Sequence, residues 1–110
     1  MLKYILAVVI SMAAQSVAGN DELLVFTAPG CRPCAHMKSL LARHPELTQH
    51  FKVVYFDITT AEETAQLFQV QVVPTFVRLR GDHEIARLVG STTERGFREW
   101  VDKHDEKPAK

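Results

Sequence analysis

Cys31 and Cys34 are the residues whose type and spacing point most directly to chemistry, because they form the motif Cys31-Arg-Pro-Cys34. Two thiols at this spacing serve as a redox pair, as metal ligands or as a structural disulfide. The chain has only these two cysteines, which excludes a four-cysteine zinc site, although His36 would offer a third ligand beside them. A structural disulfide would close a short loop and stabilise the fold little. The motif therefore favours a redox pair, with a metal-handling or partner-docking module as the alternative.

The residues around the motif predict a strand that leads directly into a helix. Residues 23–27 form an apolar run whose length and content are typical of a buried strand. Residues 33–43 carry apolar side chains at helical spacing, and Pro33 suits a first helical turn because its missing N–H is not needed there. The cysteine pair is therefore expected where a buried strand meets the N-terminus of a helix.

That position would activate one of the two thiols. A helix N-terminus presents unpaired N–H groups and the positive end of the helix dipole, which stabilise a thiolate and lower the pKa of a cysteine. Cys31, at the mouth of the helix, is predicted to be the nucleophile. Arg32 and Pro33 are predicted to tune its thiolate, Arg32 through its permanent charge. Cys34, one turn further along, is predicted to be less exposed and to act as the resolving thiol.

The rest of the chain predicts alternating elements followed by a hairpin. Strands are predicted at residues 52–57, 75–79 and 84–89, the last two joined by a turn at Gly81-Asp82. Two segments match the capping box that begins helices: Thr60-Ala-Glu-Glu63 and Ser91-Thr-Thr-Glu94. The helix that follows the second box carries Phe97, Trp100 and Val101 on one face. The order is β-α-β-α-β-β-α, which predicts an α/β fold with a four-stranded mixed sheet flanked by three helices.

A second motif, Val73-Pro74-Thr75, lies where a strand is predicted to begin. Proline cannot donate a hydrogen bond within a sheet, so a proline that heads a strand needs a reason. Together with Cys31-Arg-Pro-Cys34 and Val89-Gly90, the motif resembles the thioredoxin superfamily, and the resemblance extends from about Leu23 to Lys103. The chain is thus similar to a small, glutaredoxin-sized thiol-disulfide oxidoreductase.

The resemblance implies a minimal thioredoxin-like fold and a role for each motif. Pro74 is implied to be cis and to lie beside the cysteine pair. Val73, Pro74 and Thr75 are implied to form a substrate platform, on which the Val73 backbone pairs with an extended segment. The Cys31 thiolate is implied to attack a substrate disulfide, and Cys34 to resolve the mixed disulfide. The expected substrates are protein disulfides and dithiols, and no metal or cofactor is expected besides the redox-active disulfide.

Several positions depart from the patterns of related families. Val25 stands where thioredoxins place a buried Asp, and Gly30 stands where they place a Trp before the first cysteine. Val72 and the pair Gly90-Ser91 stand where glutaredoxins usually have a Thr and a double glycine, which argues against dependence on glutathione. Because Val25 replaces the buried Asp of thioredoxins, proton transfer at Cys34 must involve water or another group.

Two of these residues predict how the redox pair is tuned. Arg32 places a cation beside the attacking sulfur of Cys31, which favours the thiolate. By analogy with the family, Val25 removes a carboxylate that would disfavour a second negative charge at Cys34. Both differences stabilise the reduced form, so the pair is expected to be less reducing than a typical thioredoxin.

The N-terminal residues predict an export signal. Lys3 places a positive charge near the start, residues 4–14 form an apolar run interrupted only by Ser11, and Ser16-Val17-Ala18 offers the small residues that a signal peptidase recognises. The apolar run is short for a membrane helix, which needs about 20 residues, and an uncleaved anchor is the alternative. The predicted organisation is a signal peptide at 1–18, a thioredoxin-like domain at 19–104 and a polar tail at 105–110. The mature protein is expected to be a periplasmic monomer with a membrane or periplasmic redox partner.

The composition bounds the function further. The 110 residues allow one domain. The 13 Lys and Arg residues balance 13 Asp and Glu residues, so no basic excess supports nucleic-acid binding. Arg78 and Arg80 on one predicted strand and Arg87 on the next are expected to be solvated.

Overall fold

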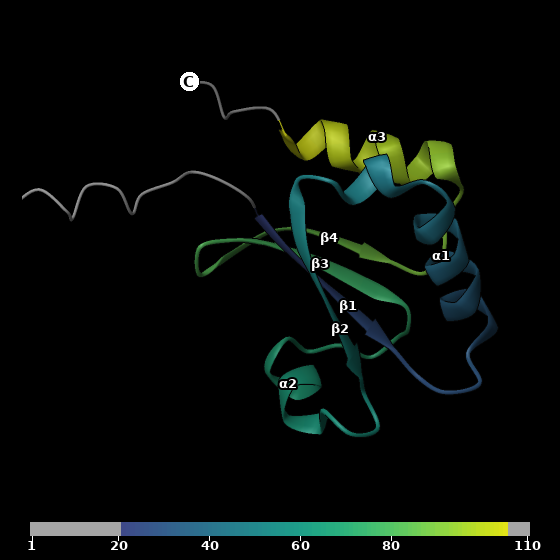
Figure 1. The fold of residues 1–110 in the computed structure, drawn as a ribbon. Coiled ribbons are helices and arrows are strands. Elements are labelled where there is room, and N and C mark those ends of the chain that lie inside the picture. The colour runs from purple at the N-terminus through teal and green to yellow at the C-terminus, as the bar shows by residue number, and fades with distance from the viewer. Residues whose placement is uncertain (1–20, 106–110) are drawn as a thin grey trace, which may run out of the picture.

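The computed structural model describes residues 21–105 (Figure 1). Its elements are β1 (Asp21–Thr27), α1 (Arg32–Arg43), the 3₁₀ helix η2 (Pro45–Thr48), β2 (Phe51–Asp57), α2 (Glu62–Leu67), β3 (Thr75–Arg80), β4 (His83–Val89) and α3 (Glu94–Asp105). This order confirms the predicted β-α-β-α-β-β-α arrangement, with η2 added after α1. The predicted signal peptide at 1–18 and residues 106–110 of the predicted tail lie outside the described residues. Between residues 21 and 105, no helix is long and apolar enough to cross a membrane.

The sheet has four strands in the order β2-β1-β3-β4 and is mixed, as predicted. β1 runs parallel to β2 and antiparallel to β3, so that Leu24 lies between Val54 and Val77. β3 and β4 form the antiparallel hairpin, with a bulge in its register. β2 lies at the edge of the sheet, which is why this strand, apolar on both faces in sequence, is only half-buried and exposes Tyr55.

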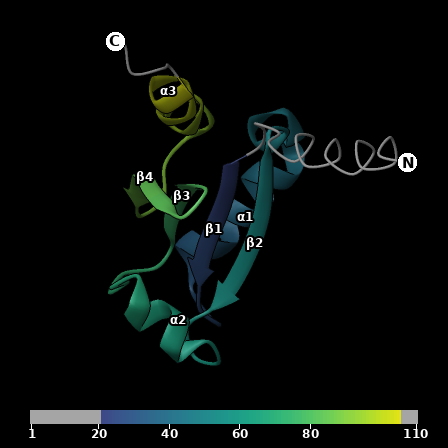
Figure 2. The same cartoon turned by 90° about the vertical axis from the view of Figure 1, so that its left-hand side faces the viewer.

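Helices cover both faces of the sheet. Successive residues of a strand point to opposite faces, and in β1 the residues Leu23 and Val25 join one buried cluster with side chains of α1, η2 and α3. Leu24 and Phe26 join a second cluster with Ala65 of α2. Thus α1 and α3 pack on one face and α2 on the other, and Figure 2 shows α1 behind β1 and β2.

The apolar face of α3 is aromatic, as the sequence predicts. Phe97 is fully buried, with its ring centroid 5.4 Å from that of Phe76 in β3 and 5.5 Å from that of Trp100. Trp100 and Val101 are half-buried against the same cluster. The Trp100 ring also lies edge-on to His104, and its Nε1 is buried without a hydrogen-bond partner among residues 21–105.

Both predicted capping boxes are wrong in detail. α2 begins after Ala61 without a side-chain cap, because the Thr60 hydroxyl instead donates to the Asp57 carbonyl oxygen at 3.3 Å. α3 begins at Glu94, later than the Ser91 box implies, and the Thr93 hydroxyl oxygen accepts the N–H of residue 96 at 3.0 Å. The sequence offered several hydroxyl residues at each helix start, and backbone geometry decides whether one of them caps the helix.

An ion-pair network around the buried Asp21 and Arg78 holds the start of β1, which corrects the expectation that Arg78 is solvated, while Arg80 is exposed as expected. Arg78 is only 4% exposed. Its Nε donates to the Asp21 carboxylate at 2.7 Å and its Nη2 to Asp105 at 2.5 Å. Arg80 donates to the other oxygen of Asp21 at 3.0 Å. These four residues are called the far-end network below.

Strand alternation explains the burial of Arg78. Its side chain shares a face with Phe76, two residues earlier, and therefore points toward α3. There its guanidinium lies over the Phe51 ring at 4.7 Å. Burial alone would raise the pKa of Asp21, but hydrogen bonds from Arg80 and Arg78 and their positive charges outweigh it and lower the pKa. Arg87 is also paired, through its Nε, with Glu84 at 2.6 Å.

Candidate active site

Cys31 and Cys34 are joined in a disulfide at the start of α1, with their Cα atoms 5.2 Å apart. Cys31 is the N-cap residue of the helix, and its Sγ accepts the backbone N–H of Cys34 at 3.1 Å. Cys31 is half-buried, whereas Cys34 is only 3% exposed. An incoming group therefore reaches the sulfur of Cys31, which is also the sulfur that the helix N–H groups stabilise.

The chain turns sharply into this helix end. Gly30 has a φ of 75°, a left-handed conformation that suits glycine. The N–H of Cys31 then donates to the Ala28 carbonyl oxygen at 3.3 Å. Pro33 lies in the first turn, as predicted, and that turn contains no acidic residue. Arg32 and Pro33 are both exposed, so the positive end of the helix dipole is left without a neutralising carboxylate.

The Val73-Pro74-Thr75 segment lies against the disulfide. The Val73–Pro74 peptide bond is cis, and the Val73 carbonyl oxygen is 4.0 Å from the Cys31 Sγ. The Thr75 hydroxyl donates to the Val72 carbonyl oxygen at 2.6 Å. Pro74 and Thr75 are buried and Val73 is half-buried. The fold thus brings the two sequence motifs, which are distant in the chain, into contact.

A third segment completes the surroundings of the disulfide. The N–H of Gly90 donates to the Pro74 carbonyl oxygen at 2.7 Å, and the N–H of Thr92 donates to the Met37 sulfur in α1 at 3.4 Å. We call residues 28–30, 71–75 and 89–93 the site loops.

Two exposed valines of the site loops received no role in the sequence analysis. Val72 is 50% exposed and Val89 is 55% exposed, and Val89 lies opposite Thr75 in the sheet register. Their position, just before the Val73-Pro74-Thr75 motif and next to Gly90, was the available signal.

Strand β1 contributes a buried apolar residue to the core that α1 covers. Val25 is 1% exposed and belongs to the buried cluster that also contains Met37 and Leu40 of α1. A carboxylate at this position would face hydrocarbon, where an unpaired charge is costly.

Possible metal ligands gather at the opposite end of α1. His44 lies between Glu46, 3.6 Å from its Nδ1, and Glu94, 3.4 Å from its Nε2. Each carboxylate therefore faces a different ring nitrogen, and the Arg98 guanidinium donates to both of them, at 2.7 Å to Glu94 and 3.4 Å to Glu46. This geometry is that of an ion-pair cluster. In the alternative metal site of the sequence analysis, His36 is exposed on α1 and the two sulfurs are bonded to each other.

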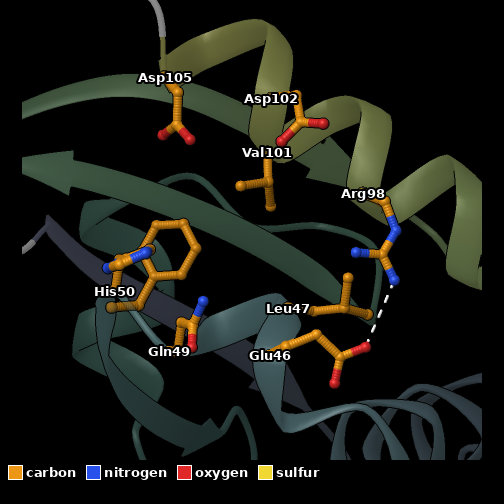
Figure 3. A pocket seen from close by; sticks show the side chains of 9 residues that line it. Glu46, Leu47, Gln49, His50, Arg98, Val101, Asp102 and Asp105 are labelled. Carbon is orange, nitrogen blue, oxygen red and sulfur yellow. Dashed lines mark hydrogen bonds and ion pairs between the residues drawn. The ribbon is translucent and has the colours of Figure 1, made fainter.

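A cavity of about 250 Å³ lies beside this cluster, between η2 and α3. Figure 3 shows Leu47 and Val101 facing it from the two helices, with Glu46 and Arg98 joined at its rim. No residue of the site loops lines it. The cavity is thus separate from the redox chemistry.

Comparison with known proteins agrees with this geometry. The thioredoxin family model matches residues 10–103. The chain belongs to the thioredoxin family. An H-type thioredoxin of Brassica oleracea is 34% identical over 79 residues, which are 68% of this chain and 63% of that protein. A thioredoxin of Geodia cydonium is 30% identical over 90 residues, covering 77% of this chain and 82% of that protein.

Solved thioredoxin structures share the fold. The Fasciola hepatica thioredoxin superposes with a TM-score of 0.69 at 26% identity, covering 78% of this chain and 82% of that one. The chain spans about 63% of the length of the Brassica thioredoxin. The superfamily expected from the Cys31-Arg-Pro-Cys34 and Val73-Pro74-Thr75 motifs is thereby confirmed.

Proposed function

We propose that this thioredoxin-family protein is an exported thiol-disulfide oxidoreductase that exchanges electrons with protein disulfides through Cys31 and Cys34. The observation that carries the proposal is the environment of the Cys31 sulfur. It is the accessible sulfur of the disulfide, it accepts a helix N–H at 3.1 Å, and it lies 4.0 Å from the Val73 carbonyl oxygen. A thiolate at this position is stabilised by the helix and lies beside a backbone that an extended substrate can reach.

The proposed reaction transfers two electrons by thiol-disulfide exchange. In the reduced protein, the Cys31 thiolate attacks one sulfur of a substrate disulfide, and the other substrate sulfur leaves as a thiolate that takes up a proton. Cys34 then loses its proton to water, and its thiolate attacks the Cys31 sulfur of the mixed disulfide. The Cys31–Cys34 disulfide forms and the second substrate thiol is released. The reverse sequence oxidises a substrate dithiol.

The remaining site residues are proposed to hold the substrate and to tune the pair. Val73 supplies backbone groups for pairing with an extended segment, while Pro74 and Thr75 fix the shape of that platform. Arg32 and the helix end favour the Cys31 thiolate, and Pro33 fixes the first turn. The redox-active disulfide is proposed to act without another cofactor.

Export is proposed from sequence alone. The charge at Lys3, the largely apolar run of residues 4–14 and the small residues Ser16-Val17-Ala18 support a signal peptide. The mature protein would then act as a periplasmic monomer with a membrane or periplasmic redox partner. Mass spectrometry of the exported protein should find Gly19 at its N-terminus, and a full-length, membrane-retained product would contradict this assignment.

A matched pair of variants tests the cysteine roles. Cys34→Ser keeps the nucleophile but removes the resolving thiol, so it should accumulate mixed disulfides with substrates. Cys31→Ser should accumulate none. Trapping by Cys31→Ser alone would reverse the two roles.

A second experiment tests the reaction itself. The wild-type protein should catalyse reduction of insulin by dithiothreitol, and both variants should fail. A purified protein that carries stoichiometric zinc or copper and does not accelerate insulin reduction would instead support the metal-handling alternative.

A further inference from the structure

The site loops carry no charged side chain. Residues 28–30 are Ala, Pro and Gly, residues 71–75 are Gln, Val, Val, Pro and Thr, and residues 89–93 are Val, Gly, Ser, Thr and Thr. The contacts from Cys31 to residues 28 and 73, and from residue 90 to residue 74, hold these three segments around the disulfide. A substrate segment bound here therefore meets a neutral, partly apolar surface.

Arg32 places a positive charge beside this neutral surface. It follows Cys31 in the chain, is exposed, and forms no ion pair with any residue between 21 and 105. The first turn of α1 contains no acidic residue. The next titratable group on this face of α1 is His36, one turn further along and also exposed. The charge of Arg32 is therefore available to a bound partner.

Five other arginines of the protein contrast with Arg32. Arg78 and Arg80 share Asp21, Arg87 pairs with Glu84, and Arg98 binds two glutamates. Arg95 at the surface has Glu99 within 3.7 Å. Arg43, at the other end of α1, bonds only the Ser39 hydroxyl among residues 21–105 and lies away from the disulfide. At the disulfide, by contrast, a counter-charge can come from the substrate.

We propose that Arg32 determines substrate specificity, selecting polypeptide disulfides that carry an Asp or Glu next to the attacked cysteine. The inference rests on the proposed oxidoreductase function and names its substrate class. A carboxylate beside the substrate cysteine would approach the guanidinium, because Arg32 directly follows Cys31 in the chain. Opposite charges attract and like charges repel even in water. The neutral site loops provide no competing charge.

The effect of Arg32 on the substrate differs from its effect on the thiolate. A cation beside Cys31 changes the reactivity of that sulfur toward every substrate by the same factor. Attraction to a substrate carboxylate changes only the substrates that have one. The ratio of kcat/KM for two peptides of opposite charge therefore cancels the first effect and retains the second.

The test uses two peptide disulfides that differ only in a Glu or a Lys next to the cysteine. At low ionic strength, the Glu/Lys ratio of kcat/KM for the wild-type protein should exceed that for Arg32→Gln by about 3- to 10-fold. Comparing the two proteins removes the intrinsic reactivity of the peptides. The difference should shrink toward unity in about 0.5 M salt, because exposed charges are screened, and Arg32→Glu should invert the preference.

Matched control variants test whether the change in the Glu/Lys ratio comes from Arg32. Arg43→Gln removes an exposed arginine at the other end of the same helix, where it bonds Ser39, and should leave the ratio unchanged. His36→Gln should change the ratio less than Arg32→Gln does. Equal ratios in the wild type and in Arg32→Gln, or a larger change in His36→Gln, would overturn the inference. Failure of the wild-type protein to reduce either peptide would instead refute the proposed oxidoreductase function.

Discussion

The two ends of β1 lie in opposite electrostatic surroundings. At its start, the buried carboxylate of Asp21 receives hydrogen bonds from Arg78 and Arg80, and Arg78 also reaches Asp105 of α3. Beyond its other end, the site loops are uncharged, and Arg32 remains unpaired among residues 21–105. The far-end network satisfies its charges internally and ties together β1, β3 and α3. At the site end, Arg32 has no ionic partner among residues 21–105. The ion pairs that hold the fold together and the charge proposed to recognise substrates therefore lie in different regions of one small domain.

The largest expected effect comes from breaking the far-end network. Arg78→Met removes the buried guanidinium, leaving Asp21 with Arg80 alone, and should lower the free energy of unfolding by about 3–5 kcal/mol. Urea denaturation followed by circular dichroism measures the loss. Arg95→Met is the control, because Arg95 is exposed and its ion pair is worth at most about 1 kcal/mol. Equal losses of unfolding free energy in the two variants would mean that burial of the Arg78 ion pair contributes nothing to stability.

Acid should weaken the same network. The pKa of Asp21 is lowered in the folded protein by its arginine partners, so as pH falls the unfolded chain binds the proton first. The stability from Asp21 is therefore complete above the ordinary aspartate pKa of about 4 and is lost as pH falls through the lower folded value. The stability difference between the wild type and Asp21→Asn, measured by urea denaturation from pH 7 down to pH 3, should shrink with acid. A constant difference would contradict this assignment.

The smallest expected effect lies at the site end. Arg32→Gly removes an exposed cation, and screening limits the result to less than about a tenfold fall in the thiolate fraction of Cys31 at a given pH. Ultraviolet absorbance of the thiolate against pH measures it. The redox potential should become more negative by about 30 mV or less, starting from a wild-type value above the roughly −270 mV of thioredoxin. An unchanged or larger thiolate fraction in Arg32→Gly would exclude the arginine as a tuning residue.

Sequence reasoning succeeded where the determining interactions are local. The apolar run of residues 23–27 and the helical spacing after Pro33 were enough to locate the disulfide at a strand-to-helix junction. The contact between Val73 and Cys31 needed the family resemblance, since no local pattern brings these residues together. The burial of Arg78 depends on which sheet face α3 covers and on Asp105, a partner from the far end of the chain. The burial of a strand residue therefore depends on tertiary packing, which the alternation of residues along the strand does not reveal.

The position of the single tryptophan has a consequence for spectroscopy. With Gly30 before the first cysteine, the only indole of the chain is Trp100, whose ring lies against Phe97 and His104 on α3. Its fluorescence emission should therefore follow the packing of α3 on the sheet more closely than the oxidation state of the disulfide. The oxidised and reduced proteins can then be compared in unfolding experiments with one optical signal, whose native baseline is common to both.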